Sequence, residues 1–265
     1  MTPAAGRPAT VVAPASWRAI DFISDLHLTD ETSRAFALWA DYLHGTNADA
    51  VFILGDLFEV WVGDDARFEG FEARSAAVLA DAAARRPIAF MAGNRDFLLG
   101  SAMLEACGVA ALADPTLLCA FGERVLLSHG DAMCIDDVSY QAFRQVVRGA
   151  AWQCDFLARP LAERRAMAYA LRAESERHKA AQPAGSWFDV DSRTALEAME
   201  SAAAPALIHG HTHRPGSAEL APGRWRHVLS DWELDGAGHP RAEVLRWQST
   251  GFVRLTPGQA MAAAA

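Results

Sequence analysis

The sequence contains few cysteines and almost no lysine. Its four cysteines form no C-x-x-C pair and lie next to no histidine motif; they are Cys107, Cys119, Cys134 and Cys154. Neither a zinc knuckle nor a disulfide framework is therefore indicated, and free thiols are expected. Lys179 is the one lysine among 24 Lys and Arg residues. Codon bias toward Arg could explain the scarcity, but a lysine that is kept inside the predicted helical insertion favours a role for it.

Long hydrophobic runs and a positive net charge are also lacking. No apolar run approaches the roughly 18–20 residues needed to cross a bilayer, and residues 1–17 do not have the pattern of a secretory signal. We therefore expect an intracellular protein. The formal net charge of −9 argues against nucleic-acid binding, because a phosphate backbone requires a basic surface.

The sequence does have enough length and apolar content for a sizeable core. It comprises 265 residues, of which 51% are hydrophobic, so one catalytic domain with one insertion is plausible. Short apolar runs alternate with segments of helical spacing through the first half of the chain. Strands are predicted at residues 19–23, 50–54, 88–91 and 125–127, and helices at 32–44, 71–85 and 98–107. This alternation favours mixed sheets that are covered by helices.

After residue 129 the pattern changes to helical periodicity over residues 137–179, broken at Gly149 and Arg159-Pro160. Strand patterns return at residues 206–208, 225–229, 242–247 and 252–255, and the last three are predicted to be antiparallel. We therefore predict an α/β fold, an αββα sandwich with a helical lid insertion. The predicted core comprises residues 18–133 and 186–256, the insertion 134–185, and flexible tails 1–17 and 257–265.

The predicted insertion is locally basic. Residues 144–179 contain eight cationic and four acidic side chains, although the whole chain is acidic. One interpretation is an ordinary solvated helix face. The other is a surface that meets an anionic ligand.

Five short motifs stand where predicted strands end. They are Asp25-Leu26-His27, Gly55-Asp56, Gly93-Asn94-Arg95-Asp96, Ser128-His129-Gly130 and Gly210-His211-Thr212-His213. In open α/β sheets, ligands bind outside the carboxyl ends of the strands, where such loops converge. The motifs therefore bring together seven candidate metal ligands: Asp25, His27, Asp56, Asn94, His129, His211 and His213.

The ligand set indicates the kind of metal. Carboxylate or amide oxygens and imidazoles, without thiolate, suit Mn²⁺, Fe²⁺, Co²⁺ or Zn²⁺ better than Ca²⁺ or Mg²⁺. Asp56 has two oxygens and could bridge two ions, and two ions about 3.5–4 Å apart can clamp a phosphoryl group. His211 and His213 could bind one ion or different ions. Asp96 is expected to orient Arg95 or to cap the following turn. His209 is expected to be structural or to contact a ligand from outside.

Taken in order, the blocks D-x-H, G-D, G-N-R-D, H-G and G-H-x-H resemble those of the calcineurin-like metallophosphoesterases over about residues 20–214. Finer segments resemble the branch of this family that acts on UDP-2,3-diacylglucosamine in lipid A biosynthesis. These segments are Gly55–Glu59, Gly93–Gly100, His129–Asp131, Asp136-Asp137, Tyr140–Arg144 and Ile208–Pro215.

The resemblance implies hydrolysis of the pyrophosphate bond to give UMP and 2,3-diacylglucosamine 1-phosphate, by attack of a metal-bridging hydroxide on the α-phosphorus. It implies two Mn²⁺ ions, with Fe, Co or Zn as alternatives. One ion would use Asp25, His27, Asp56 and His213, and the other Asp56, Asn94, His129 and His211. The implied catalytic residues are Asp56, Asn94, Arg95 and His211. Arg95 stands where many relatives have histidine, and its guanidinium is suited to bind the pyrophosphate.

The resemblance also implies that the helical lid takes the acyl chains. Substrate contacts are implied for Asn94, Arg95, Asp137, Tyr140, Arg172, Ser175, Lys179, Gln182 and His211. Gln182 departs from the lysine that relatives often carry. The implied protein is a monomer in the cytoplasm, peripheral on the inner membrane, without a nucleic-acid partner.

Two alternative functions predict different residues in the sequence. A phosphoesterase for another phosphodiester or a soluble nucleotide-sugar would share the metal ligands, but Arg95 and the long insertion argue against it. A non-catalytic scaffold of the same fold would typically lack ligands, and here all seven are present.

Overall fold

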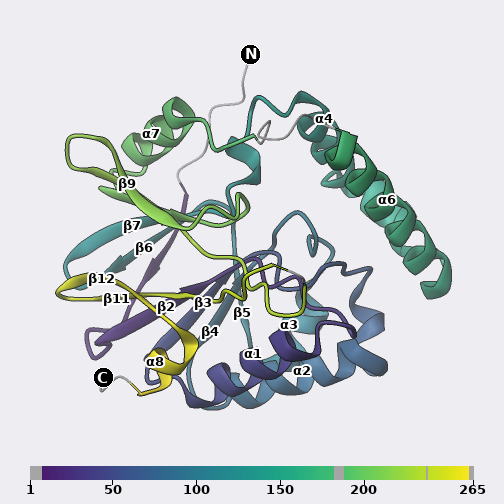
Figure 1. The fold of residues 1–265 in the computed structure, drawn as a ribbon, viewed down its shortest axis with the longest axis horizontal. Helices are drawn as coiled ribbons and strands as arrows, with labels where there is room; N and C mark the ends of the chain where they lie inside the picture. Colours follow the sequence, from purple (N-terminus) through teal and green to yellow (C-terminus); the bar gives the residue numbers. More distant parts are fainter. Residues whose placement is uncertain (1–7, 182–187, 237, 263–265) are drawn as a thin grey trace.

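Two six-stranded sheets pack face to face, and helices cover their outer faces (Figure 1). The computed structural model describes residues 8–181, 188–236 and 238–262. One sheet has the strand order β1-β6-β7-β8-β10-β9, and the other has the order β12-β11-β2-β3-β4-β5. The strands are β1 (Ala9–Val12), β2 (Ala19–Ile23), β3 (Ala50–Leu54), β4 (Ile88–Met91), β5 (Ala110–Leu112), β6 (Thr116–Ala120), β7 (Glu123–Leu127), β8 (Ala206–His209), β9 (Gly216–Ala221), β10 (Arg224–Val228), β11 (Val244–Gln248) and β12 (Gly251–Leu255).

The helices lie in three groups. Those packed on the sheet that contains β2 are α1 (Ser33–Gly45), α2 (Gly70–Ala83), α3 (Ser101–Cys107) and α8 (Pro257–Ala262). Helix α7 (Ser192–Ser201) packs on the other sheet. Between β7 and α7 come α4 (Val138–Val147), α5 (Ala150–Leu157) and α6 (Leu161–Ala181). Short 3-10 helices span Asp64–Phe68 and Asp131–Met133.

The layers follow from the alternation of side chains along buried strands. In β3, Val51 and Ile53 pack in the core beneath the helices, whereas Phe52 and Leu54 pack between the two sheets. Because successive side chains leave opposite faces of a strand, an entirely apolar strand fills two cores at once. The predicted αββα sandwich is confirmed.

The predicted tails are wrong over two segments. Ala9–Val12 forms β1, which pairs in parallel with β6 at the edge of its sheet. Pro257–Ala262 forms α8, in which Ala260 is fully buried and its carbonyl oxygen accepts from Arg246 at 2.9 Å. Both segments are short and weakly patterned, and tertiary contacts fix their structure.

Strand pairing differs from the prediction in one further respect. Strands β11 and β12 are antiparallel as predicted, but β10 runs parallel to β8 and antiparallel to β9. Strands β5, β6 and β9 were not predicted as separate elements. Exposed positions interrupt β5 and β9, whereas β6 alternates buried and half-buried positions.

The helical segment between β7 and α7 breaks at the residues predicted. Gly149 separates α4 from α5, and Pro160 directly precedes α6. Figure 1 shows α6 projecting beside the two sheets instead of lying on either of them. In the described part of the chain, no helix has both the length and the apolar character to span a membrane.

Candidate metal centre

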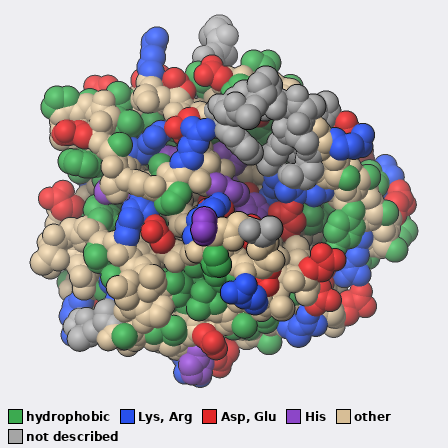
Figure 2. All heavy atoms as spheres, viewed as in Figure 1, with side chains coloured by type: hydrophobic (Ala, Val, Ile, Leu, Met, Phe, Trp, Pro, Cys, Tyr) green, Lys and Arg blue, Asp and Glu red, His purple; other side chains and the backbone are tan. Residues whose placement is uncertain are grey.

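Five loops from both sheets converge at one edge of the sandwich. Strands β2, β3 and β4 are parallel neighbours in one sheet, and β7 and β8 are parallel neighbours in the other. The loops that follow these five strands carry all seven candidate ligands. In Figure 2, histidine side chains gather near the middle of the visible face, with charged side chains around them.

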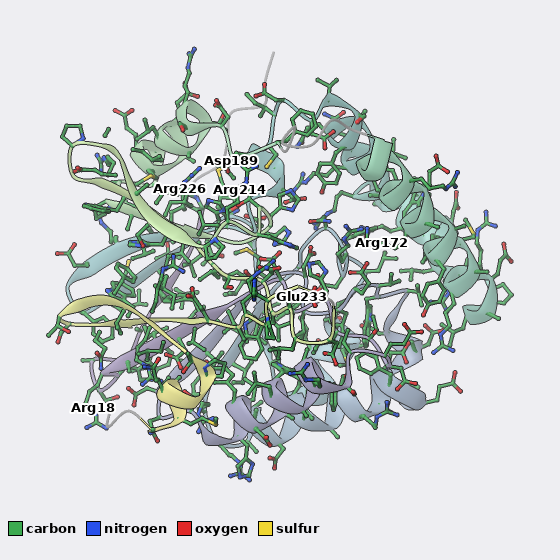
Figure 3. All side chains as sticks on the ribbon, viewed as in Figure 1. Arg18, Arg172, Asp189, Arg214, Arg226 and Glu233 are labelled. Carbon is green, nitrogen blue, oxygen red and sulfur yellow. The ribbon has the colours of Figure 1, made fainter. Side chains whose placement is uncertain are left out.

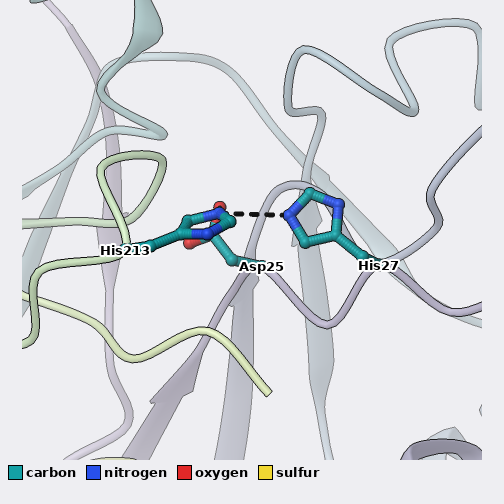
Figure 4. A group of neighbouring side chains, drawn as sticks. All are labelled: Asp25, His27 and His213. Carbon is teal, nitrogen blue, oxygen red and sulfur yellow. Dashed lines mark hydrogen bonds and ion pairs between the residues drawn. The ribbon is translucent and has the colours of Figure 1, made fainter. Parts of the chain in front are cut away.

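Asp25, His27 and His213 form one group of potential ligands (Figure 4). The Nε2 atoms of the two imidazoles are 3.1 Å apart, and Nε2 of His213 is 3.5 Å from Oδ1 of Asp25. Asp25 is fully buried, whereas His213 is exposed. This group therefore opens toward solvent.

Asp56, His129 and His211 form the second group, and Asn94 completes it. Oδ1 of Asn94 lies 2.9 Å from Nε2 of His129 and 2.8 Å from Nδ1 of His211. Nδ1 of His129 is 2.9 Å from the carbonyl oxygen of Leu54. If Nδ1 carries the proton, the lone pair on Nε2 faces the group.

Asp56 lies between the two groups. Its Oδ1 is 3.7 Å from Nε2 of His129, and its Oδ2 is 3.9 Å from Nε2 of His27. Oδ1 also accepts the backbone N–H of Arg95 at 2.8 Å. One carboxylate oxygen thus faces each group, as a bridging ligand requires.

Two glycines let these loops approach one another. A Cβ on Gly93 would overlap the carboxylate and backbone nitrogen of Asp56, and one on Gly210 would overlap the carboxylate of Asp25. Neither position has room for a side chain. Packing between loops therefore determines where the two carboxylates lie.

The carboxylates set the electrostatics of the centre. Burial disfavours ionisation of Asp25, but His213, His129 and His27 outweigh burial and hold its pKa well below the usual range. Burial disfavours the charged form of His129, but Asp56, Asp131 and Asp25 raise its pKa to about 9. The site therefore favours positive charge, for which a proton and a divalent cation compete.

Burial acts in the other direction on two further histidines. It lowers the pKa of His211 to about 4, with the charge of His129 adding to the effect. Burial also lowers the pKa of His209 to about 4. His209 has its Nδ1 2.8 Å from the carbonyl oxygen of Gly210 and lies behind the loop, in keeping with the structural role expected for it.

Asp96 stabilises the turn that carries Asp56. It accepts backbone N–H groups of Gly93 at 2.8 Å and Leu57 at 2.8 Å, with longer contacts to Asp56 and Phe58. Burial and the charge of Asp56 raise its pKa to about 6. Its carboxylate therefore caps backbone groups of the Asp56 loop and of Gly93, instead of the turn that follows it in the sequence.

Three carboxylates around the ligands were not predicted. Oε2 of Glu59 is 2.8 Å from Nδ1 of His27, and Oδ2 of Asp231 is 3.5 Å from Nδ1 of His213. Asp131 is fully buried two residues after His129. Such outer carboxylates orient ligating imidazoles and raise their basicity. Glu59 and Asp131 stand two or three residues after a ligand, which was the available signal for these two, whereas Asp231 follows β10, far along the chain from the last motif.

Glu59 and Asp131 also contact the helical insertion. Asp131 accepts from the Tyr140 hydroxyl and, at 2.8 Å, from Nε of Arg144. Glu59 accepts from Nε of Arg172. Burial would raise the pKa of Glu59, but His27, Arg95 and Arg172 lower it to about 2.

The residues predicted to contact substrate are placed as follows. Arg95 is partly buried, and its Nε has no hydrogen-bond partner among the described residues. The ring of Tyr140 has its centroid 6.1 Å from that of His211. Asp137 caps the N-terminus of α4 by accepting the Tyr140 N–H at 3.0 Å.

Arg172 lies on the side of α6 that faces the rest of the molecule (Figure 3). Gln182 and the side chains of Ser175 and Lys179 lie outside the described part.

The donor atoms fit a pair of divalent metal ions. Two groups of oxygens and imidazole nitrogens lie side by side, with one carboxylate between them. Two ring nitrogens at 3.1 Å place their ligating atoms close enough to share one cation. Carboxylates, an amide and imidazoles without thiolate match the borderline divalent metals.

The fold and this centre define a metal-dependent phosphoesterase, and comparison with known sequences agrees. The sequence pattern of the calcineurin-like phosphoesterases matches residues 19–215. The chain belongs to this family, and its classification as a hydrolase is confirmed.

Three bacterial relatives narrow the class, and each is named UDP-2,3-diacylglucosamine hydrolase. The protein of Chromobacterium violaceum is 46% identical over an alignment that covers 83% of this chain and 93% of the relative. That of Aromatoleum aromaticum is 42% identical, covering 87% and 93%. That of Xanthomonas oryzae pv. oryzae is 41% identical, covering 87% and 95%.

Proposed function

We propose that the chain hydrolyses the pyrophosphate bond of UDP-2,3-diacylglucosamine, giving UMP and 2,3-diacylglucosamine 1-phosphate in lipid A biosynthesis. The observation that carries the proposal is the complete set of seven ligating side chains in two adjoining groups. The name shared by relatives more than 40% identical supplies the substrate.

We further propose that both metal ions are Mn²⁺. Asp25, His27, His213 and Asp56 would hold one, and Asp56, Asn94, His129 and His211 would hold the other. When bound, such a pair supplies Lewis acidity, which lowers the pKa of water and neutralises charge on phosphoryl oxygens. Asp56 then sets the separation of the two groups.

Arg95 is proposed to bind the pyrophosphate. Its backbone N–H is fixed on Asp56 at 2.8 Å, so the side chain leaves directly beside the metal groups. Nε of its guanidinium is buried without a hydrogen-bond partner in the described part of the chain. A buried N–H without a hydrogen-bond partner is costly, and a phosphoryl oxygen would accept from it and would gain stabilisation as charge develops.

The three insertion helices are proposed to form a lid over the acyl chains. Val138 and Val146 on α4 and Leu171 on α6 are exposed large apolar side chains, and such surface favours contact with lipid. We propose that the protein is a monomer that meets the cytoplasmic face of the inner membrane peripherally. Proposed polar contacts from the insertion are Asp137, Tyr140, Arg172, Ser175, Lys179 and Gln182.

A substrate panel tests the function. The full chain with Mn²⁺ is given UDP-2,3-diacylglucosamine in mixed micelles or a soluble UDP-sugar, and UMP release is measured by chromatography. We expect a preference of roughly 100-fold or more in kcat/KM for the diacylated substrate. Equal rates would refute the lipid assignment. Mn²⁺ binding without release of UMP from any substrate would favour a non-catalytic scaffold.

A further inference from the structure

Glu59 lies beside His27 because the segments after β2 and β3 are hydrogen-bonded to each other. The His27 N–H donates to the Asp56 carbonyl at 3.0 Å, and the Glu59 N–H donates to the Leu28 carbonyl at 3.2 Å. Leu28 and Phe58 form a parallel bridge between the same segments. The backbone register therefore fixes Glu59 next to the metal group that contains His27.

The two oxygens of Glu59 contact different parts of the molecule. Oε2 lies 2.8 Å from Nδ1 of His27. Oε1 accepts from Nε of Arg172, which comes from the inner side of α6 (Figure 3). The Glu59 side chain is 19% exposed, so both contacts are largely shielded from water. One carboxylate thus joins a ligating histidine to the insertion.

We infer that Glu59 is a positioning residue that couples the placement of α6 to the orientation of His27. A carboxylate that accepts from Nδ1–H fixes the tautomer and the ring orientation of a ligating histidine. In this chain Oε2 of Glu59 lies 2.8 Å from Nδ1 of His27, and Nε2 on the other side of the ring lies 3.1 Å from Nε2 of His213. Loss of Glu59 is expected to loosen both the tautomer and the ring angle of His27.

The contact with Arg172 extends this role to the substrate, and this part rests on the proposed function. A guanidinium carries five N–H donors in one plane, so Arg172 can contact a phosphoryl oxygen while it remains paired with Glu59. The pair holds that plane near the metal groups. Glu59 thereby aligns one metal ligand and one phosphate-binding group.

Other anchors of α6 separate this role from simple attachment of the helix. Arg164 pairs with Asp65, and Arg165 lies 3.2 Å from Glu72 and 3.1 Å from Glu69. Glu72 has no contact with a metal ligand among the described interactions. Glu72→Gln is therefore a matched control, because it also weakens an ion pair between α6 and the core.

Mn²⁺ binding without substrate tests the His27 part by titration calorimetry on the full chain. We expect Glu59→Ala to weaken binding at one site by roughly 10–100-fold, the usual effect of losing an outer partner of a ligand. Glu59→Gln keeps an acceptor for Nδ1–H and should retain binding within about threefold. Thermal unfolding in EDTA verifies that each variant folds.

Steady-state kinetics on the diacylated substrate test the Arg172 part. We expect Glu59→Gln to raise KM about tenfold with little change in kcat, because the amide no longer holds the guanidinium by charge. Glu72→Gln should leave Mn²⁺ affinity and KM within about twofold of the wild type.

Two results would overturn the inference. One is wild-type Mn²⁺ affinity in a folded Glu59→Ala variant. The other is a loss in Glu72→Gln as large as that in Glu59→Ala, which would make Glu59 only an anchor of α6. If the chain does not hydrolyse the diacylated substrate at all, the proposed function fails, while the Mn²⁺ titrations still decide the role of Glu59.

Discussion

Most of the proposed metal ligands have backbone conformations that side chains rarely adopt. Five of the seven have φ between +48° and +66°; they are Asp25, His27, Asp56, His211 and His213. Asp and His tolerate this left-handed region better than most residues, yet each such residue still costs on the order of 1 kcal/mol. Because the strained residues lie in one centre, the packing of the surrounding loops must maintain these backbone conformations.

Gly93 offers a direct test of how closely these loops pack. A Gly93→Ala substitution places a methyl group on the Asp56 carboxylate and backbone, so the carboxylate between the two groups must move. We expect kcat/KM with Mn²⁺ to fall by roughly 100-fold, since a displacement of about 1 Å in such a site costs that much. UMP release from the diacylated substrate is the measurement.

The control for Gly93 is Gly258, where an added Cβ meets nothing within 4 Å. It lies in α8, so alanine is favourable there. Gly258→Ala should retain full activity and equal or greater stability. Wild-type activity in Gly93→Ala would show that the Asp56 loop adjusts without loss, contrary to the packing described.

At the scale of secondary structure elements, α4 is attached to the metal centre through Asp131. The Tyr140 hydroxyl and Nε of Arg144 both donate to this buried carboxylate. Arg148, one turn further along the chain, donates to the Gly93 carbonyl at 2.8 Å. Helix α4 therefore contacts two of the loops that carry metal ligands.

An Asp131→Asn substitution should loosen α4. Loss of the charge leaves the Arg144 side chain without its partner, and breaking a buried pair costs about 3–5 kcal/mol. We expect a fall of about 3 kcal/mol in the free energy of unfolding in EDTA, and faster hydrogen exchange in peptides that span α4. Glu197→Gln, which breaks an exposed pair with Arg193, should leave stability and hydrogen exchange as in the wild type.

His227 on β10 should make stability depend on pH. Burial and the nearby positive charge of Arg254 lower its pKa to about 4 from 6.5. Between these two values the unfolded chain binds the proton and the folded chain does not. The contribution of neutral His227 is therefore complete above pH 6.5 and is lost as the pH falls toward 4, by about 1.4 kcal/mol per pH unit.

Comparison with His227→Gln isolates this effect from other groups, including His209. The free energy of unfolding is measured by urea denaturation in EDTA from pH 7.5 to 4.5. We expect the wild type to lose about 2 kcal/mol more than the variant across this range. Parallel pH profiles for the two proteins would contradict the assignment of a buried neutral imidazole.

The wholly buried strands could be predicted from the sequence, whereas the edge strands β1, β5 and β9 could not. The wholly buried strands β2, β3 and β4 are continuous apolar runs, and the helix breaks at Gly149 and Pro160 have local causes. Strands β1 and β9 are mostly exposed, so their pairing depends on partners distant in sequence. The basic run of the insertion was ambiguous for the same reason, since Asp65 and Glu59 pair with it across about a hundred residues.

At the scale of the whole molecule, the centre exists only where the two sheets meet. Asp25 and Asp56 follow strands of one sheet, and His129 and His211 follow strands of the other. The order of the motifs was sufficient to predict this convergence, because parallel strands direct their carboxyl ends to the same edge. The outer carboxylates Glu59, Asp131 and Asp231 required the three-dimensional contacts, because each contacts a side chain that the motifs do not specify.

Removal of metal should destabilise the entire molecule, because both sheets contribute ligands to one centre. Without cations, the buried carboxylates of Asp25 and Asp56 repel each other across the site. The five residues with strained backbones then have no metal ion to bind. Saturating Mn²⁺ at about 100 times its dissociation constant adds about 2.7 kcal/mol per site, or roughly 10–20 °C in Tm for two sites in a chain of this size. Differential scanning calorimetry with EDTA and then with excess Mn²⁺ measures the shift. Asp56→Asn should lose most of this shift while retaining a cooperative transition in EDTA, since Asp56 faces both groups. An equal Mn²⁺ shift in Asp56→Asn would contradict the role of Asp56 as the shared ligand.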